Sequence, residues 1–534
     1  MKTTSEGIET GGAGRWAKVI DHTRCIGCHA CTTACKSENE VPLSVTRTYV
    51  KYVDVGHFPQ ARRSFQVTRC NQCEDAPCVT ACPTASMHKR PDGIVDFDKS
   101  ICIGCKACIA ACPYDAIFIN PEDKSAEKCN FCAHRLDVGL EPACVVVCPT
   151  QAILVGDMDD PLSEVSRIIH RDAVAVRRPE KETHPKLFYK GADQATLDPL
   201  AARRPDGGLF MWSEQGDVPH QVHGGHPGNG RRASGHASGA NSSAAALLSY
   251  DVIHRAPWDW RVSAYTFTKS IAAGAYLAPL LLGALGLLPF TSTLWGWTGP
   301  LVAMLALLAT GGLLVWDLEH PERFWMVLTR PQWKSWLARG GVIITAYGGV
   351  LAAHLGLTAL GRADLTPALG WIGGPLAAMS ALYTAYLFAQ ARARDLWQSP
   401  LLPAHLLVQA IGAGAAMLLV GVDVAGPPES LVVGTGGVDA GAAIQWLFRG
   451  AIGAHLLLVV GEATMGHPTA HAALAARNMI FGAWGHFFWL ALAFGVLALL
   501  VAGASAPIAA LAGLVSLALY EHAFVQAGQS VPLA

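Results

Sequence analysis

The stretch CIGCHACTTAC at residues 25–35 recurs as CIGCKACIAAC at residues 102–112. Both copies space four cysteines as C-x2-C-x2-C-x3-C, so one sequence unit is used twice. Two further groups share another pattern, which begins C-N-x-C and ends C-V-x-x-C-P-T. The four groups contain all sixteen cysteines of the chain: Cys25, Cys28, Cys31 and Cys35; Cys70, Cys73, Cys78 and Cys82; Cys102, Cys105, Cys108 and Cys112; Cys129, Cys132, Cys144 and Cys148.

The C-x2-C-x2-C-x3-C spacing is typical of proteins that bind two cubane iron–sulfur clusters, in which the fourth cysteine of each run binds the other cluster. Sixteen thiolates at four per cluster predict four [4Fe–4S] clusters, and a small domain with four clusters is suited to conducting electrons. Zinc is the main alternative ligand, but structural zinc sites pair two C-x2-C knuckles across a longer gap. Disulfides would require an oxidising compartment, and no secretory signal precedes Cys25.

The duplication also predicts the fold of this part. Pro83, Pro113 and Pro149 follow the last cysteine of three groups, where a proline would end the short helix that carries the cysteine. Group one has Lys36 instead. Apolar segments at 93–97 and 116–119 resemble short strands. We therefore expect an α+β domain over residues 1–160, built from two ferredoxin-like halves related by a pseudo-twofold axis.

The second half of the chain is apolar. No Asp, Glu, Lys or Arg occurs between Ser270 and Trp316, or between Asn478 and Tyr520. A membrane-spanning helix needs about 20 apolar residues, so each run is long enough for two, whereas buried helices of a soluble core rarely stay uncharged for so long. We predict an all-α polytopic membrane domain over residues 251–534 with about eight helices: 267–288, 299–316, 341–360, 368–390, 403–422, 444–462, 484–503 and 507–525.

Charged loop residues predict the orientation. Cations concentrate in loops on the side of the N-terminal domain, and such loops normally face the cytoplasm. This places a multi-pass protein in the inner membrane with its cysteine domain in the cytoplasm, although the same cations could form a docking surface. The cations counted are Arg323, Arg330, Lys334, Arg339, Arg392, Arg394 and Arg477, against Arg362 and Arg449 on the other side.

Residues 161–250 are expected to form an extended polar linker rich in Gly, Ser and His. Its four histidines, which could bind a metal, are explained equally well as part of a solvated tether. With a net charge of −1, nothing indicates a nucleic-acid partner, and no Walker or Rossmann motif is present. The histidines are His220, His223, His226 and His236.

Residues 16–155 resemble the four-cluster electron-transfer subunit of the DMSO reductase (molybdopterin) family. Residues 250–534 resemble the polysulfide reductase-type membrane subunit, the NrfD family, in the loop sequences WDLEHPERF (316–324) and YLFAQA with RDLWQSP (386–400). The resemblance implies that two subunits are fused here. It also implies a crossed set of cluster ligands: Cys25, Cys28 and Cys31 with Cys148; Cys129, Cys132 and Cys144 with Cys35; Cys70, Cys73 and Cys78 with Cys112; Cys102, Cys105 and Cys108 with Cys82.

The resemblance further implies that the membrane part binds a quinone, menaquinone or ubiquinone, near the cluster-bearing face. Ionisable residues inside membrane spans are costly and usually functional, and quinone reduction needs proton donors as well as electrons. The candidates lie at the N-terminal-side ends of the expected helices, although Lys269 could extend to the interface and Asp317 could pair with Arg323. These candidates for quinone and proton chemistry are Lys269, Asp317, His320, Arg323, His405, Glu462 and His486.

These features predict the electron-transfer and quinone-reacting subunit of a membrane-bound oxidoreductase, with substrate chemistry on a molybdopterin-type partner. Oxidation of a sulfur compound such as sulfite is favoured. The alternatives are a polysulfide- or tetrathionate-type reductase or a hydrogenase subunit using quinol, and a membrane-anchored polyferredoxin with no quinone site. A proton path beginning at His354 or His455 is a weaker possibility, because packing explains both residues equally well.

Overall fold

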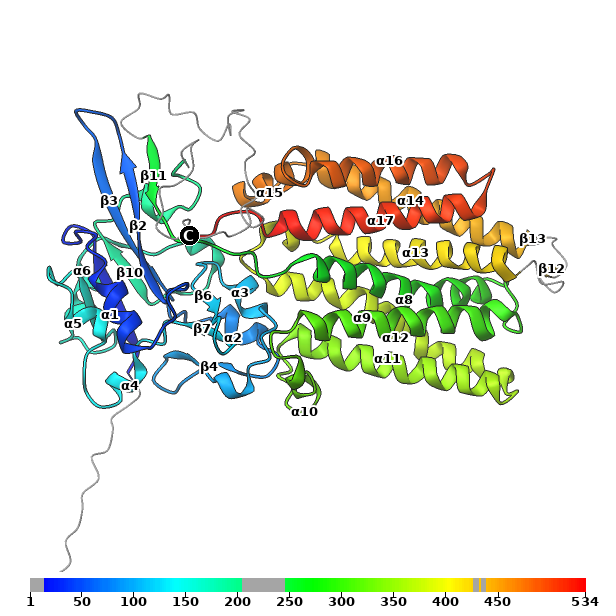
Figure 1. The fold of residues 1–534 in the computed structure, drawn as a ribbon, viewed down its shortest axis with the longest axis horizontal. Helices are drawn as coiled ribbons and strands as arrows, with labels where there is room; N and C mark the ends of the chain where they lie inside the picture. Colours follow the sequence, from blue (N-terminus) through cyan, green and yellow to red (C-terminus); the bar gives the residue numbers. More distant parts are fainter. Residues whose placement is uncertain (1–13, 204–244, 426–431, 434–437) are drawn as a thin grey trace, which may run out of the picture.

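The structure is a computed structural model that describes residues 14–203, 245–425, 432–433 and 438–534. An α+β domain containing every cysteine caps one end of a long helical bundle, as Figure 1 shows. Both predicted fold classes are therefore confirmed. The four histidines of the expected linker lie outside the described residues.

Two sheets organise the cysteine domain. In the first, β1 pairs antiparallel with β8 and parallel with β10, and β9 lies at the edge. In the second, the β2–β3 hairpin receives β11, so a strand from the region just ahead of the bundle returns to the N-terminal domain. The bounds are β1 (Trp16–Asp21), β8 (Ile153–Asp157), β10 (Leu187–Lys190), β9 (Val174–Ala175), β2 (Thr48–Val55), β3 (Arg62–Arg69) and β11 (Ala246–Tyr250).

Two small hairpins lie between the cysteine groups, and short helices contain or directly follow cysteines. The strands expected at 93–97 and 116–119 are present as β5 and β6. The bounds are β4 (Met87–Lys89), β5 (Val95–Phe97), β6 (Ile117–Ile119), β7 (Ala126–Lys128), α1 (Ala30–Glu38), α2 (Pro77–Ala81), α3 (Ala107–Ala111), α4 (Ala133–Leu136) and α5 (Ala143–Val146).

Proline determines where the cysteine helices end. Helices α2 and α3 each end at the residue before the fourth cysteine of their group, and Pro83 and Pro113 follow. In group one, where Lys36 takes the place of the proline, α1 continues to Glu38. This difference agrees with the inability of proline to continue a helix, because it lacks a backbone N–H and clashes with the preceding turn.

Residues 161–203 do not form the extended linker that composition predicted. They contain α6 (Glu164–Arg171), β9, β10 and α7 (Gln194–Leu197), and β10 lies inside the main sheet between β1 and β9. The folded domain therefore continues to residue 203. The short polar segments gave no local sign of this, because their order comes from pairing with a strand more than 150 residues earlier.

The bundle contains, among the described residues, seven helices that are long and apolar enough to span a membrane. An eighth candidate is a helix pair, α15 and α16, bent by 67° at a short break. The prediction of about eight spans is therefore confirmed. The helices are α8 (Trp260–Ala284), α9 (Gly299–Asp317), α11 (Trp336–Ala359), α12 (Thr366–Gln390), α13 (Leu402–Ala425), α14 (Ala440–Thr464), α15 (Ala470–Phe481), α16 (Gly485–Val501) and α17 (Ala506–Gly528).

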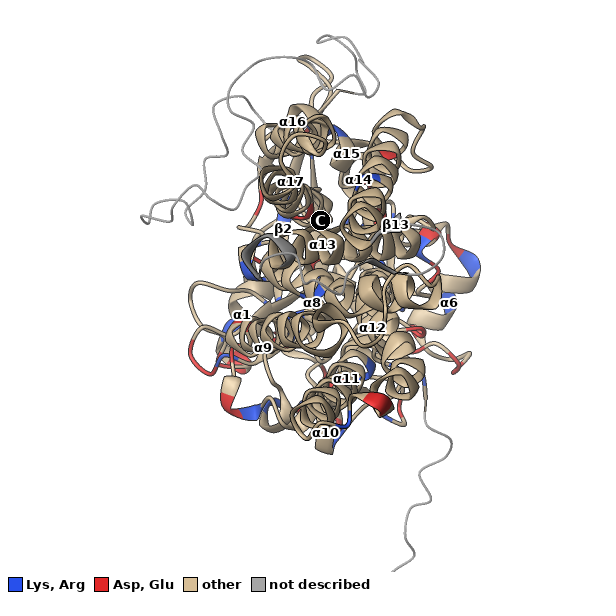
Figure 2. Cartoon of the chain, turned by 90° about the vertical axis from the view of Figure 1, so that its right-hand side faces the viewer, with Lys and Arg blue, Asp and Glu red and all other residues tan. Residues whose placement is uncertain are grey.

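Small residues bring the central helices close together. A Cβ atom on Gly274 of α8 would lie 1.7 Å from the carbonyl oxygen of Ala410 on α13, so only glycine permits this contact. Close approach at small residues is the usual way in which helices pack inside a membrane. Seen along the bundle from its far end, the helices are largely free of charged residues (Figure 2).

Candidate functional site

The crossed pairing of cysteines is visible in two cavities of the cysteine domain. One cavity is lined by Cys70, Cys73, Cys78 and Cys112. The other is lined by all three close cysteines of group one together with Cys148. In both cases the fourth thiol comes from a different group, as the family resemblance implied.

The remaining eight cysteines also approach one another across groups. The Nδ2 atom of Asn39 lies 3.7 Å from the Sγ atoms of both Cys35 and Cys132. Burial is the main cause that raises the pKa of the Cys105 thiol, and the charge of Cys82 raises it further. The two sulfurs therefore lie close together. These contacts join Cys35 to group four and Cys82 to group three.

The donor set fits polynuclear iron–sulfur clusters. In the described part of the chain, no three His, Cys, Asp or Glu side chains converge closely enough to hold a single metal ion, whereas a cavity ringed by four thiols suits a larger inorganic core. Burial raises the pKa of the Cys31 thiol to about 11 and that of Cys35 to about 12, so metal binding must displace protons. The Sγ atom of Cys148 also accepts a hydrogen bond from a backbone N–H, that of Ala152 at 3.2 Å.

Cys144 differs from the other buried thiols. Burial disfavours its thiolate, but the charges of Arg69 and Lys18 outweigh burial and lower the pKa of Cys144 to about 7. Arg69 Nη1 donates to Cys144 Sγ at 2.9 Å, and Lys18 Nζ lies 3.8 Å from the same atom.

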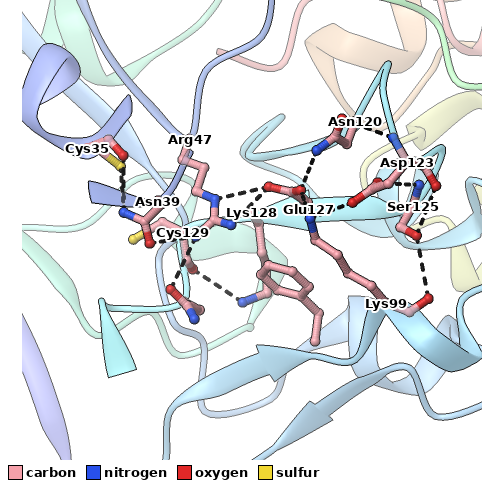
Figure 3. A network of polar contacts seen from close by, with 12 residues as sticks. Cys35, Asn39, Arg47, Lys99, Asn120, Asp123, Ser125, Glu127, Lys128 and Cys129 are labelled. Atoms are coloured by element: carbon pink, nitrogen blue, oxygen red, sulfur yellow. Dashed lines mark hydrogen bonds and ion pairs between the residues drawn. The ribbon is translucent and has the colours of Figure 1, made fainter. Parts of the chain in front are cut away.

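A buried polar network connects Cys35 to the strand that precedes Cys129, as Figure 3 shows. Arg47 pairs with Glu127 at 2.9 Å, and both side chains are almost fully buried. Arg47 also donates to Asn39 at 2.8 Å, and Asn39 in turn donates to the carbonyl oxygen of Cys35. The network therefore fixes Cys35 relative to β7, which leads into Cys129.

Group three of the cysteines faces the bundle. Trp258 Nε1, just before α8, donates to the carbonyl oxygen of Cys105 at 3.2 Å. Lys106 lies 3.5 Å from the Asp317 carboxylate and 3.1 Å from that of Glu319. Gly104 has a φ of 68°, and a Cβ atom there would lie 2.5 Å from Glu319 Cβ, so this glycine permits the close approach of the loop that follows α9.

His320 and Arg323 also lie where the cysteine domain contacts the bundle, which we call the docking surface. Arg323 Nη1 donates to the carbonyl oxygens of Lys99 and Cys102, both at 2.9 Å, and His320 Nε2 lies 2.9 Å from that of Asp123. The Asp317–Arg323 pair considered from the sequence is replaced by the contact of Asp317 with Lys106. Part of the positive charge counted for membrane orientation is therefore used to hold the two domains together.

Lys269 lies inside the bundle and does not extend to its end. Because α8 begins at Trp260, Lys269 lies about 14 Å along the helix axis from its start. The side chain is 0% exposed, and its ammonium donates to Ala381 O at 3.1 Å and to the hydroxyl of Thr384. Glu521 of α17, also buried, interacts electrostatically with Lys269. The sequence reasoning missed Glu521, although an acidic residue inside an apolar helix is itself a signal.

A second polar cluster joins three helices. His405 of α13 lies 2.9 Å from His455 of α14, ring nitrogen to ring nitrogen, and 3.8 Å from the Glu462 carboxylate. Tyr520 of α17 donates to that carboxylate at 2.6 Å. Of the predicted site residues, His405 and Glu462 therefore lie together in this cluster. His455 and Tyr520 complete it, and Tyr520 was not predicted. Since Tyr520 and Glu521 are adjacent, α17 contributes to both polar clusters.

His486 stands apart from these groups. It is exposed on α16, and its ring packs 4.2 Å from that of Phe487. His354 is fully buried toward the far half of the bundle, where its Nδ1 lies 3.2 Å from the Tyr276 hydroxyl. The predicted residues therefore divide between the docking surface, two buried clusters and the outer surface of the bundle.

The cysteine pockets and the apolar bundle together define an iron–sulfur electron-transfer protein with its own multi-pass membrane domain. Residues 62–158 match the family model for a 4Fe-4S dicluster domain, and residues 250–525 match that for polysulphide reductase, NrfD. The chain therefore belongs to the NrfD polysulphide reductase family and carries a 4Fe-4S dicluster domain ahead of the NrfD region.

Several curated proteins are similar to the N-terminal part. A tetrathionate reductase subunit of Salmonella typhimurium is 44% identical over 208 residues, which is 38% of this chain and 80% of that protein. A polysulfide reductase subunit of Wolinella succinogenes is 44% identical over 179 residues, 33% of this chain and 94% of that protein. The arsenate respiratory reductase iron-sulfur subunit ArrB of a Shewanella species is 35% identical over 223 residues, 33% of this chain and 95% of that protein.

Proposed function

We propose that this chain passes electrons through four [4Fe–4S] clusters between a catalytic partner and the membrane quinone pool. The observation that carries the proposal is the position of group three, whose Cys105 and Lys106 contact Trp258 and Asp317 at the bundle. A cluster held there would be the last one before the membrane. When bound, the clusters supply one-electron redox chemistry.

The positions of the exposed and buried cysteines support a path that runs across the domain toward the bundle. Cys28 is exposed and just precedes α1, which lies away from the bundle (Figure 1), whereas Cys82 and Cys108 are buried in groups whose backbone carbonyls accept hydrogen bonds from Ser335 and Trp258 at the bundle. The exposed end would receive the catalytic partner, which we propose to be a molybdopterin-type subunit on the cytoplasmic side. Conversion of the soluble substrate would take place on that partner.

The two buried polar clusters in the bundle support a quinone site near group three. Quinone reduction takes up two protons with two electrons and quinol oxidation releases them, so in either direction the site needs groups that hold and pass protons. Glu462, with Tyr520 and His405, and the pair Lys269 and Glu521 are such groups. The helix bounds place all of them in the half of the bundle nearest the cysteine domain. Asp317 would position the loop beside the site through Lys106.

The relatives favour a reductase partner. Those named above are subunits of tetrathionate, polysulfide and arsenate reductases, and none supports the preference for sulfite that the sequence suggested. We therefore propose that quinol supplies electrons and that the partner reduces an oxidised sulfur compound or a similar acceptor.

The experiment is anaerobic purification from membranes with partners retained, followed by EPR during titration with a quinol analogue. Four [4Fe–4S] signals that become reduced by the analogue support the proposal, and the co-purifying subunit identifies the substrate. Clusters that dithionite reduces but the analogue does not would make the bundle an anchor only.

Variants localise the site. Glu462→Gln should slow cluster reduction by the analogue by about 100-fold, the usual scale for a lost proton-transfer group, with unchanged cluster content. Asp364→Asn is the control, because Asp364 is exposed between α11 and α12, where it pairs with Arg362. Equal rates in both variants would exclude Glu462 from the site.

A further inference from the structure

A buried arginine lies beside one set of cysteines. Arg69, at the end of β3, is 2% exposed and precedes Cys70 in sequence, yet its guanidinium points to a different group. Its Nη1 donates to Cys144 Sγ at 2.9 Å. Its Nε and Nη2 have no hydrogen-bond partner among the described residues. The charges that act on it most strongly are those of cysteine sulfurs: Cys144 first, then Cys31 of group one, then Cys129.

A second buried cation joins it. Lys18 of β1 is 1% exposed, and its Nζ lies 3.8 Å from Cys144 Sγ and 4.0 Å from the centre of the Phe131 ring. A buried charge is costly unless an opposite charge compensates it. The compensating charge available to both cations is that of the thiolates and of the cluster they would hold.

The membrane end of the cysteine domain is charged differently. Its cations lie beside acidic side chains: Lys106 is within 3.5 Å of the Asp317 and Glu319 carboxylates, and Arg323 is 3.7 Å from that of Glu322. Positive charge at this end is therefore offset by acidic side chains. At the other set, Arg69 and Lys18 both contact the Cys144 sulfur and not a carboxylate, so the two sets differ in local charge although both consist of four cysteines.

We propose that Arg69, assisted by Lys18, raises the reduction potential of the cluster held by Cys129, Cys132, Cys144 and Cys35 above that of the cluster at the membrane end. Reduction adds one electron and so one negative charge, which a nearby buried cation stabilises strongly because the surroundings have a low dielectric constant. The guanidinium keeps its proton throughout, and no bond to the protein breaks.

The arrangement matters for the chemistry of quinol, and this inference rests on the proposed function. Quinol releases two electrons, whereas each cluster accepts one. With Arg69 in place, the first electron moves to the cluster beside Arg69. The cluster of group three, at the bundle, is then oxidised again and can accept the second electron. Arg69 would thus determine which cluster holds the electron, without contacting the quinone.

The test is a potentiometric titration of the full chain in membranes, monitored by EPR with dithionite and mediators, so that no quinone site is needed. In Arg69→Gln, the reduction equilibrium constant of one cluster should fall about tenfold or more, equivalent to ~59 mV for one electron. Arg69→Lys should retain most of the potential. Arg63→Gln is the control, since Arg63 lies on the same strand but pairs with Asp54 at the surface.

Unchanged potentials in Arg69→Gln with all clusters assembled would overturn the proposal. If that variant fails to assemble its cluster, Lys18→Met decides, because it removes a charge 3.8 Å from the same sulfur. A lower potential for one cluster in Lys18→Met supports the proposal, and unchanged potentials refute it. Failure of the quinol response alone would contradict the proposed function and leave this titration unaffected.

Discussion

A histidine between two carboxylates should make the junction of the domains sensitive to pH. His254 lies in the segment that joins β11 to α8, where its Nδ1 contacts Asp115 and its Nε2 lies 3.1 Å from Asp251. Burial alone disfavours the charged ring, but the carboxylates of Asp251 and Asp115 outweigh it and raise the pKa of His254 to about 10 from 6.5. The folded protein therefore holds this proton more tightly than the unfolded chain.

The size and direction of the effect follow from this difference. At 1.36 kcal/mol per pH unit, the protonated histidine contributes on the order of 5 kcal/mol to the free energy of unfolding. Because the folded pKa is the higher one, the contribution is fully present below pH 6.5 and is lost as pH rises from 6.5 to about 10. The native protein should thus lose stability across this window.

The assay compares thermal unfolding of the native chain and His254→Gln from pH 6 to pH 10. At pH 6 the variant should unfold lower by about 10 °C, taking ~2–4 °C per kcal/mol for a domain of this size, and the gap should close by pH 10. His184→Gln is the control, because His184 pairs with Asp75 at the exposed surface. A gap that stays constant with pH would mean that His254 is neutral in the folded protein and would refute the reasoning.

Four other changes have expected outcomes. Cys112→Ser should remove one cluster, so iron content by chemical assay should fall by roughly a quarter. Glu521→Gln should slow quinol-driven cluster reduction by about 100-fold in stopped-flow measurements, and a native rate would remove Glu521 from the site. Lys106→Met removes the nearer of the two cations beside the buried Asp317 carboxylate and leaves Arg261 at 3.9 Å, so it should cost about 1.5–3 kcal/mol in thermal unfolding. Gly274→Ala should prevent recovery of a monodisperse protein in detergent, because the new Cβ would overlap the Ala410 carbonyl.

The cysteine motifs allowed much of the fold to be predicted because iron–sulfur chemistry imposes local spacing. Short helices, terminating prolines and the strands at 93–97 and 116–119 all follow from sequence neighbours. The prediction that residues 161–203 form a linker was wrong because β10 is ordered by pairing with the distant strand β1, which amino-acid composition cannot reveal. Long apolar runs likewise revealed the membrane helices, whereas the exact start of α8 at Trp260 was missed.

The candidate site was harder to predict, because helix neighbours are invisible in a single sequence. The shared face of His455 and Glu462 was foreseeable from their spacing, but their contacts with His405 and Tyr520 depend on how α13, α14 and α17 pack. Asp317 was selected as a membrane-end carboxylate, but its partner Lys106 lies 211 residues away. Glu521 could have been found by treating every acid within a predicted span as a candidate.

Strand β11 has a consequence for assembly. It pairs with β2 of the N-terminal domain, and the first membrane helix begins ten residues later. Docking of the two domains is therefore intramolecular, and its effective concentration is set by a short tether and not by the amounts of two separate chains. Contacts such as Lys106 with Asp317 need only select the correct geometry, so the junction can remain polar without a risk of dissociation.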